Sequence, residues 1–325
     1  MFWIVATVIF LLLLAFLRWG IHRSLAPERL VATRSPSNVG LHHLDVSLPT
    51  ENAKTLFGWY IPAGRDETAP ARVPALVLVH GWGGNAETLL PLALPLHQAG
   101  FALLMIDSRC HGRSDQDTFS SMPRFAEDLD HAIDWLKQRQ GIDPAAIAVI
   151  GHSVGAAASL LAASRCKDIA AVVSIAAFTH PFALMRRWLA VKGIPYRPFG
   201  WLMLHYIEWV IGHRFDDIAS INTVRRVNCP TLLVHGAEDM TVPVSEAHAI
   251  HAARSGDHVR LHVVAGSHDE YQDIDREMPV LVDFLLAAIG ESIAATPNDS
   301  PSTKACSQAE QGFADEQLVS PSPGG

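Results

Sequence analysis

A single serine stands between two glycines in the stretch GHSVG, residues 151–155. An apolar run ends just before it and an alanine-rich run begins just after it, so Ser153 is expected at a sharp turn from a strand into a helix. Gly151 and Gly155 suit such a turn, because strand and helix crowd each other there. A hydroxyl on this turn projects clear of the sheet, and the free N–H groups of the following helix favour a developing anion. These features predict that Ser153 is a nucleophile.

A serine hydroxyl needs a base to take its proton, and the base needs a carboxylate to orient it. Two acids, Glu238 and Asp239, follow the apolar run TLLVHG, and His268 follows LHVVAGS. All three lie just beyond the C-terminal ends of predicted strands. They are therefore expected with Ser153 at one edge of a parallel sheet, where such folds bind ligands. The order predicts a serine, acid and histidine arrangement, with either acid as a candidate.

The elements that must position these residues alternate along most of the chain. Apolar runs typical of strands buried on both faces lie at 75–80, 101–107, 147–151, 169–177, 231–236 and 259–264. Helices are expected at 86–99, 122–140, 153–165, 244–253 and 276–290. Two strands at 44–48 and 55–60 precede them as an antiparallel pair. The alternation predicts an α/β fold, with a mostly parallel sheet and helices on both of its faces.

Taken together, the motifs resemble the α/β-hydrolase superfamily of serine hydrolases, including its serine aminopeptidase-like and lysophospholipase-like members. GHSVG, HGAEDMTVP and GSHDEY stand where that superfamily has its nucleophile, acid and histidine, and the resemblance covers roughly residues 44–290. It implies Ser153 as nucleophile, Asp239 as acid and His268 as base. Asp239 is favoured over Glu238, because the acid of the superfamily usually precedes an xxVP stretch.

The resemblance also implies an oxyanion hole. Its donors would be the backbone N–H of Trp82, just after the H-G pair in LVHGWGGN (78–85), and that of Val154, directly after the nucleophile. Two further glycines in this loop let it fold close to the substrate. The stretch IDSRCHGRSD (106–115) resembles a segment that is mostly structural in the superfamily. Its aspartate, arginine and histidine are therefore left out of the catalytic set.

Residues 178–214 interrupt the alternation. The segment is too long for a simple connection between strand and helix, and it holds eight aromatic residues and five Lys or Arg against a single Glu. We expect an inserted helical cap, and a bulky ordinary crossover helix is the alternative. An apolar and aromatic cap favours a lipophilic acyl substrate, and its positive charge suits anionic lipid headgroups.

The N-terminus begins with sixteen uncharged residues, FWIVATVIFLLLLAFL (2–17). If Arg18 snorkels to the interface, the apolar run reaches Ile21 and is about 20 residues long, enough to span a bilayer. A cleaved signal peptide would need a basic start and a small-residue cleavage site, and a buried core helix is the other alternative. We expect a transmembrane anchor at 1–21 and a juxtamembrane linker at 22–43. Arginines follow the run and none precedes it, which predicts a single-pass membrane protein with a cytoplasmic domain.

Composition limits the remaining possibilities. A net charge of −8 argues against a nucleic-acid binder. The four cysteines are widely spaced without a CxxC pair, which argues against a disulfide framework or zinc site and fits reduced thiols. Histidine pairs at 42–43 and at 248 and 251 come without a third ligand, so we expect no metal and no cofactor. The biased composition of residues 291–325 predicts a disordered tail.

The favoured function is a membrane-anchored serine hydrolase, a carboxylesterase or lipase-like enzyme that cleaves an acyl ester through a Ser-His-Asp triad and an acyl-enzyme. Its expected partners are a small, lipophilic acyl substrate and membrane lipid. Acyl transfer, thioester hydrolysis and peptide hydrolysis would use the same triad and stay open. A binding module without catalysis would have lost a member of the triad, and all three residue types are present.

Overall fold

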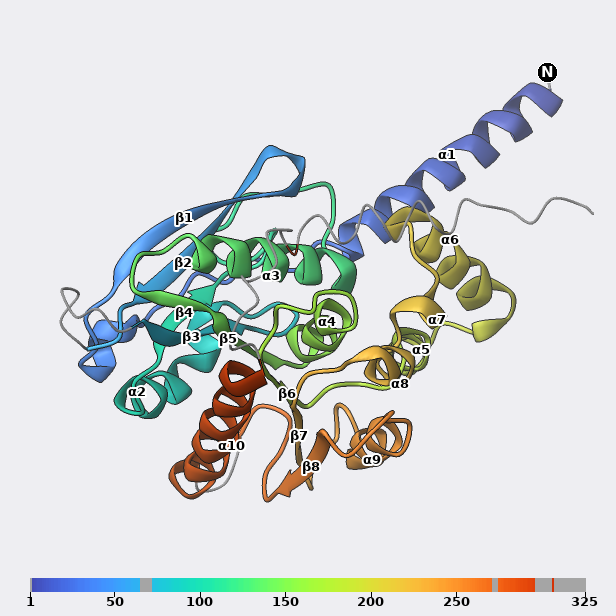
Figure 1. Cartoon of the computed structure of the whole chain (residues 1–325). Coiled ribbons are helices and arrows are strands. Elements are labelled where there is room, and N and C mark those ends of the chain that lie inside the picture. The colour runs from blue at the N-terminus through green and yellow to red at the C-terminus, as the bar shows by residue number, and fades with distance from the viewer. Residues whose placement is uncertain (1, 65–71, 271–273, 296–305, 307–325) are drawn as a thin grey trace, which may run out of the picture.

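A computed structural model of the chain describes residues 2–64, 72–270, 274–295 and 306. Strands in the described residues form one sheet, in the order β1-β2-β4-β3-β5-β6-β7-β8 (Figure 1). The strands are β1 (Leu44–Thr50), β2 (Lys54–Ile61), β3 (Val73–Val79), β4 (Ala102–Ile106), β5 (Ile142–His152), β6 (Val172–Ile175), β7 (Thr231–Gly236) and β8 (Val259–Val264). β2 is antiparallel to β1 and β4, and every pair from β4 through β8 is parallel. The predicted α/β fold is confirmed.

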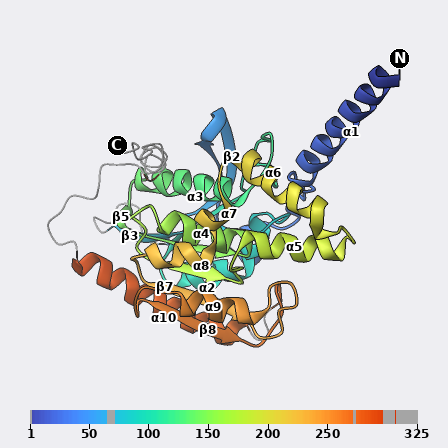
Figure 2. The same cartoon turned by 90° about the vertical axis from the view of Figure 1, so that its right-hand side faces the viewer.

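Helices cover both faces of the sheet (Figures 1 and 2). The helices that do so are α3 (Met122–Lys137) and α4 (Val154–Ala163) on one face, and α2 (Leu90–Gln98) and α10 (Ile274–Ala295) on the other. Val77 of β3 packs with the first pair, whereas its neighbours Leu76 and Leu78 pack with the second. An unbroken apolar run is what a strand buried on both faces requires. Because β3 to β8 run in parallel, the loops after them meet at one edge.

The remaining elements are short or lie in connections. They are η1 (Pro36–Val39), η2 (Glu51–Ala53), η3 (Ala86–Leu89), α7 (Phe215–Ile218), α8 (Ser220–Thr223), η5 (Val224–Arg226) and α9 (Val244–Ala252). Most were not predicted, because a helix of one turn shows too little periodicity to be recognised in a sequence.

The predicted cap segment, residues 178–214, forms two helices rather than one crossover helix. These are α5 (Pro181–Val191) and α6 (Trp201–Ile211), joined by the turn η4 (Tyr196–Gly200). We call the whole segment the cap. Several large apolar side chains of the cap are exposed: Trp188, Val191, Phe199, Trp201, Leu202 and Trp209.

A buried glutamate on α9 ties the base of the cap to the domain. Glu246 accepts hydrogen bonds from the backbone N–H of Thr179 at 2.7 Å and from its hydroxyl at 3.0 Å. The same carboxylate pairs with Arg187 on α5. Thr179 and Arg187 at the base of the cap are therefore held in place, because a buried carboxylate binds its hydrogen-bond donors firmly.

The N-terminal helix, α1 (Phe2–Ser24), extends away from the domain beside α6 (Figures 1 and 2). Its end joins the cap through the hydroxyl of Tyr206, which accepts a hydrogen bond from Arg18 Nη1 at 2.9 Å and lies 3.2 Å from His22 Nε2. The last turn also enters the core, where Ile21 and, just beyond the helix, Leu25 are buried. Helix and cap are therefore held together at this point.

The transmembrane helix predicted at 1–21 is not supported. In the part of the chain that the structure describes, no helix combines the length and the apolar character needed to cross a membrane. The end of α1 is used by the domain itself, since Ile21 is buried in the core. The uncharged run before it, residues 2–17, is shorter than the about 20 residues that a span requires.

The predicted linker, residues 22–43, packs against the domain: it begins inside α1, and Leu25 and Leu41 are buried. Arg29 donates to the carbonyl oxygen of Ser114 at 2.7 Å, and Arg34 pairs with Glu87 at 2.8 Å. These polar contacts attach the segment to the loop that contains Ser114 and to η3, which local sequence composition could not indicate.

A disulfide between Cys166 and Cys306 corrects the expectation of reduced thiols. Their Cα atoms are 5.3 Å apart, although the two residues are 140 positions apart in the sequence. The backbone N–H of Cys306 also donates to Asp134 of α3 at 3.0 Å. Apart from Cys306 and the end of α10, the predicted tail lies outside the described residues. Sequence spacing could not show this pair, because only the fold brings the two cysteines together.

Candidate active site

Ser153 occupies the tight turn between β5 and α4. Its backbone has φ 53° and ψ −112°, a conformation that residues with a side chain rarely adopt. A Cβ atom on Gly151 would lie 2.3 Å from the carbonyl oxygen of Gly155, and one on Gly155 would lie 2.5 Å from that of His80. A side chain at either position would force strand and helix apart. The predicted turn therefore forms, and it explains both glycines of GHSVG.

Ser153, His268 and Asp239 form one line of hydrogen bonds. His268 Nε2 lies 3.0 Å from Ser153 Oγ, and His268 Nδ1 lies 2.7 Å from Asp239 Oδ2. A carboxylate can only accept, so Nδ1 carries the hydrogen and donates it to Asp239. Nε2 is then the nitrogen with the lone pair, and it accepts the hydrogen of the serine hydroxyl. The structure thus brings together the three side chains that the sequence singled out, from the ends of β5, β7 and β8.

The carboxylate of Asp239 is buried and held by several donors. Its Oδ1 accepts the backbone N–H groups of Thr241 at 2.8 Å and Val242 at 2.7 Å. His235 Nε2 donates to the carbonyl oxygen of Val242 at 2.7 Å and lies 3.3 Å from Asp239 Oδ2. A carboxylate with these partners keeps one orientation, and it therefore orients His268. Sequence reasoning missed His235, whose only signal is its place at the end of the run TLLVHG.

Glu238, the rival acid, contacts a different group. Its Oε2 accepts the backbone N–H of Gly266 at 2.6 Å, and its own N–H donates to the carbonyl oxygen of Gly266 at 2.9 Å. Glu238 therefore holds the loop that carries His268, while Asp239 contacts the imidazole. The structure separates two acids that the spacing of residues left open.

The loop after β3 passes beside the serine. A Cβ atom on Gly81 would lie 3.0 Å from Ser153 Cβ, so the backbone that leads into Trp82 is close to the hydroxyl. The indole ring of Trp82 is 41% exposed and meets the ring of His111 edge-on. Val154 begins α4, and its N–H is one of the donors that a helix leaves unpaired at its start. The backbone N–H groups of Trp82 and Val154 therefore remain the candidate donors of the oxyanion hole.

Buried groups beneath this loop fix its shape. His80 Nδ1 donates to the carbonyl oxygen of Gly81 at 2.7 Å, and its Nε2 accepts the N–H of Ser108 at 3.1 Å. Burial lowers the pKa of His80 to about 4, so the ring is neutral and can accept. Asp107 accepts the N–H of Ala86 at 2.7 Å and so holds the far end of the loop.

Arg109 and Cys110 also have structural roles. The Arg109 side chain is fully buried and pairs with three carboxylates, those of Asp117, Glu127 and Asp128. Burial raises the pKa of the Cys110 thiol, which works against a reactive thiolate. These contacts agree with the view that residues 106–115 support the site rather than react.

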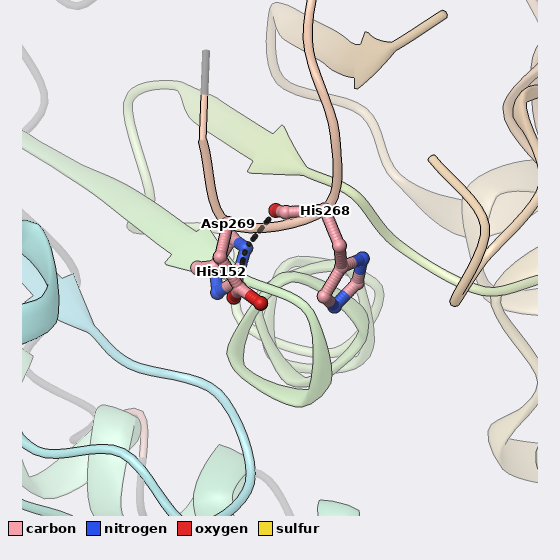
Figure 3. Close-up of side chains that lie close together, drawn as sticks. All are labelled: His152, His268 and Asp269. Atoms are coloured by element: carbon pink, nitrogen blue, oxygen red, sulfur yellow. Dashed lines mark hydrogen bonds and ion pairs between the residues drawn. The ribbon is translucent and has the colours of Figure 1, made fainter. Parts of the chain in front are cut away.

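His152, His268 and Asp269 bring nitrogen and oxygen atoms to a spacing that could hold a metal ion (Figure 3). Both ring nitrogens of His268 already serve Ser153 and Asp239. His152 Nε2 lies 2.9 Å from the carbonyl oxygen of His268, which requires a hydrogen on that nitrogen rather than a free lone pair. A second group of this kind contains the two sulfurs of the disulfide, which are not thiolates. We therefore assign neither group to a metal.

A sheet with a serine turn after β5, an acid after β7 and a histidine after β8 defines a hydrolase-fold protein of the serine type. The sequence matches the family described as serine aminopeptidase, S33, over residues 71–213. The chain has the α/β-hydrolase fold, and over the matched residues its sequence is similar to the serine aminopeptidase-like group. The family match includes Ser153 and ends before Asp239 and His268.

Relatives of several kinds share the sequence or the fold. An uncharacterized protein of Mycobacterium tuberculosis is 31% identical over 210 residues, which is 64% of this chain and 66% of that protein, slightly less than two thirds of its length. A polyketide transferase of Stachybotrys chlorohalonatus is 34% identical over 135 residues, or 41% of this chain and 43% of the transferase. An esterase of Pyrococcus furiosus is 23% identical, with a TM-score of 0.64 over 81% of this chain and 97% of the esterase. The chain thus shares the hydrolase fold of this esterase and is similar in part of its sequence to the polyketide transferase.

Proposed function

We propose that the protein is a serine hydrolase that cleaves carboxylic esters. The observation that carries this proposal is the line of hydrogen bonds from Ser153 through His268 to Asp239. As Ser153 Oγ attacks the carbonyl carbon of the ester, His268 Nε2 takes its proton. The imidazolium that forms is stabilised by the buried carboxylate of Asp239.

Attack on the ester places negative charge on its carbonyl oxygen. The backbone N–H groups of Trp82 and Val154 would donate to that oxygen, which lowers the barrier because they are oriented before the reaction begins. Protonated His268 then gives its proton to the leaving alcohol, and an acyl group remains on Ser153. A water molecule, deprotonated in turn by His268, hydrolyses this acyl-enzyme.

The decisive experiment is covalent labelling of the serine. A fluorophosphonate probe is expected to label the detergent-solubilised wild type and to leave Ser153→Ala unlabelled. Loss of ester hydrolysis in the same variant is expected to accompany loss of labelling. Labelling that persists in Ser153→Ala would overturn the assignment of the nucleophile, and a wild type that does not label would favour a binding module without catalysis.

Acyl transfer is the second candidate, because a polyketide transferase is 34% identical over 135 residues. The same triad transfers its acyl group to an alcohol or amine when that group takes the place of water. Adding acceptor alcohols to an ester assay separates the two reactions. A hydrolase releases mainly free acid, whereas a transferase yields mainly the new ester. Thioesters and peptides, which the triad could also cleave, belong in the same substrate panel.

We propose a lipophilic acyl group for the substrate. Support comes from the cap, whose large side chains are apolar and in several cases exposed, Trp201 and Trp209 among them. Each methylene that reaches an apolar surface contributes about 0.8 kcal/mol. The ratio kcat/KM for p-nitrophenyl esters is therefore expected to rise with acyl chain length. A preference for the acetyl ester would contradict this part of the proposal.

We also propose that α1 and the cap attach the protein to a membrane surface. Along α1 many apolar side chains are exposed: Trp3, Ile4, Val5, Val8, Ile9, Leu11, Leu12, Phe16 and Trp19. The contacts of Tyr206 join this helix to the cap, which carries several Lys and Arg. Full-length protein is expected to float with vesicles that contain phosphatidylglycerol, and protein without residues 2–17 is expected to float much less. Equal flotation of both proteins would contradict the role of α1.

For the compartment, we propose that the catalytic domain is cytoplasmic, because the Lys and Arg residues of the cap and of the end of α1 suit the anionic lipids of the cytoplasmic leaflet. The disulfide between Cys166 and Cys306 favours the opposite side, since disulfides persist in oxidising compartments. Fusions of the C-terminus to green fluorescent protein and to alkaline phosphatase decide between the two. Fluorescence without phosphatase activity is expected for a cytoplasmic domain, and the reverse result would place it outside.

A further inference from the structure

The residue before the serine makes a hydrogen bond to the residue that serves as base. His152 is the last residue of β5, and its Nε2 lies 2.9 Å from the carbonyl oxygen of His268. In Figure 3 this oxygen points toward His152, and the imidazole of His268 leaves the backbone in another direction, with the two ring centroids 5.1 Å apart. The bond therefore uses the backbone of His268 and leaves both of its ring nitrogens for the triad.

This bond links the two loops whose separation determines the catalytic geometry. Ser153 directly follows His152, and its hydroxyl must stay 3.0 Å from His268 Nε2 for the proton to move. The loop of His268 is held from the other side by Glu238, which binds Gly266. His152 adds a contact at His268 itself, from the same strand end that carries the nucleophile.

The protonation state of His152 suits this role. A carbonyl oxygen only accepts, so Nε2 must carry a hydrogen and donate it. The His152 ring is buried, and burial lowers its pKa, which keeps the ring neutral. The carboxylate of Asp269, 3.8 Å from Nε2, is the charged group nearest to this nitrogen on the loop, and it is largely exposed. A neutral donor can thus hold the loop without adding charge beside the base.

On its other side, the His152 ring borders a cavity of about 280 Å³. The wall of the cavity is mostly apolar and includes Leu92, Val264, Met278 and Leu281. The lining also includes Thr88, Asp269, Glu270 and Glu277, but the side-chain hydrogen bond that His152 makes among the described residues is the one to the carbonyl oxygen of His268. The cavity also leaves room for a replacement side chain, which makes substitution at this position informative.

We propose that His152 is a positioning residue, which sets the distance between the base His268 and the nucleophile Ser153 through its hydrogen bond to the backbone of His268. The proposal rests on the serine hydrolase function and goes beyond it, because it gives a role to a side chain outside the triad. Displacing a reacting group by about 1 Å can cost about 100-fold in rate. Loss of the bond should therefore act on kcat rather than on substrate binding.

The test compares two substitutions of His152 that differ in whether the new side chain has an N–H group to donate. His152→Phe keeps a ring but removes the N–H, whereas His152→Gln keeps an N–H donor at a similar reach. We expect His152→Phe to lower kcat about 10-fold to 100-fold, with KM within about twofold of wild type. His152→Gln is expected to restore kcat to within about threefold of wild type. The rate of fluorophosphonate labelling at Ser153 should follow the same order.

A matched control is available at His258, whose Nε2 donates to the carbonyl oxygen of Val227 at 2.9 Å. His258→Phe removes a similar bond at the start of β8, the end of the strand opposite to the one that His268 follows, and it is expected to leave kcat unchanged. If His152→Phe retains wild-type kcat, or if His152→Gln is as slow as His152→Phe, the inference is wrong. Labelling of wild type at Ser153 keeps that result separate from a failure of the proposed function, which would show as no labelling at all.

Discussion

The carboxylate of Glu238 accepts the backbone N–H of Gly266 at 2.6 Å, two residues before His268. Its neighbour in the chain, Asp239, accepts instead from the imidazole of His268 at 2.7 Å. Adjacent acids therefore have different tasks, since one holds a loop and the other orients a base. This difference leads to a direct test of which acid belongs to the triad.

Asp239→Asn is expected to lower kcat by about 10⁴-fold, because an amide no longer fixes the tautomer that leaves Nε2 of His268 free to accept. Glu238→Gln keeps an oxygen that can accept from Gly266, so its kcat is expected to stay within about threefold of wild type. Both are measured with one p-nitrophenyl ester, and circular dichroism checks the fold. The opposite order of activities would identify Glu238 as the acid.

Ser153 is expected to lower the stability of the protein while it enables the reaction. Its φ of 53° is a conformation that costs a residue with a Cβ atom about 1–3 kcal/mol. Ser153→Gly removes this strain, whereas Ser153→Ala removes only the hydroxyl. Both variants should be inactive, and the glycine variant should have a free energy of unfolding higher by about 1 kcal/mol in urea. Equal unfolding free energies would show that the turn is not strained.

Two buried histidines predict how stability depends on pH. Burial lowers the pKa of His80 to about 4 and that of His111 to about 3, from an ordinary value of 6.5. Between pH 6.5 and about 4 the unfolded chain therefore binds more protons than the folded one. Stability from these groups is complete above pH 6.5 and is lost as the pH falls. We expect these two groups together to lower the free energy of unfolding by about 4 kcal/mol between pH 7 and pH 5.

The control for this pH effect is His111→Asn. His111 Nδ1 donates to the carbonyl oxygen of Arg109 at 2.9 Å, and an asparagine amide can donate in the same place without titrating. Urea unfolding of this variant should depend less steeply on pH than unfolding of wild type. Identical slopes for the two proteins would show that His111 does not contribute.

The disulfide predicts a redox-dependent stability. Joining Cys166 to Cys306 closes a long stretch of chain, and such a bond contributes about 2–4 kcal/mol to stability. Cys306→Ser should be less stable than oxidised wild type by this amount and equal to wild type under reducing conditions. Peptide mapping without reductant identifies the bonded pair directly. Recovery of free thiols at both positions in purified, unreduced protein would contradict the bond.

Much of the fold could be predicted because a strand that is buried on both faces shows in the sequence as a continuous run of apolar residues. The run ALVLVH at 75–80 has no polar residue before its histidine, and β3 sends Leu76 and Val77 into two different cores. Such a run, repeated between helical segments, has few solutions other than a parallel sheet between helices. The prediction failed at α1, where the apolar run alone did not show that Ile21 enters the core of the domain.

The sequence by itself determined that a serine, an acid and a histidine follow separate strands, because a parallel sheet brings all its C-terminal strand ends to one edge. Only the tertiary structure decided which acid contacts His268, since that depends on how two loops fold against each other. It alone joined Cys166 to Cys306 and placed His152 against the backbone of the base. Local patterns show which face of an element is buried, whereas contacts between distant loops arise only when the whole chain is packed.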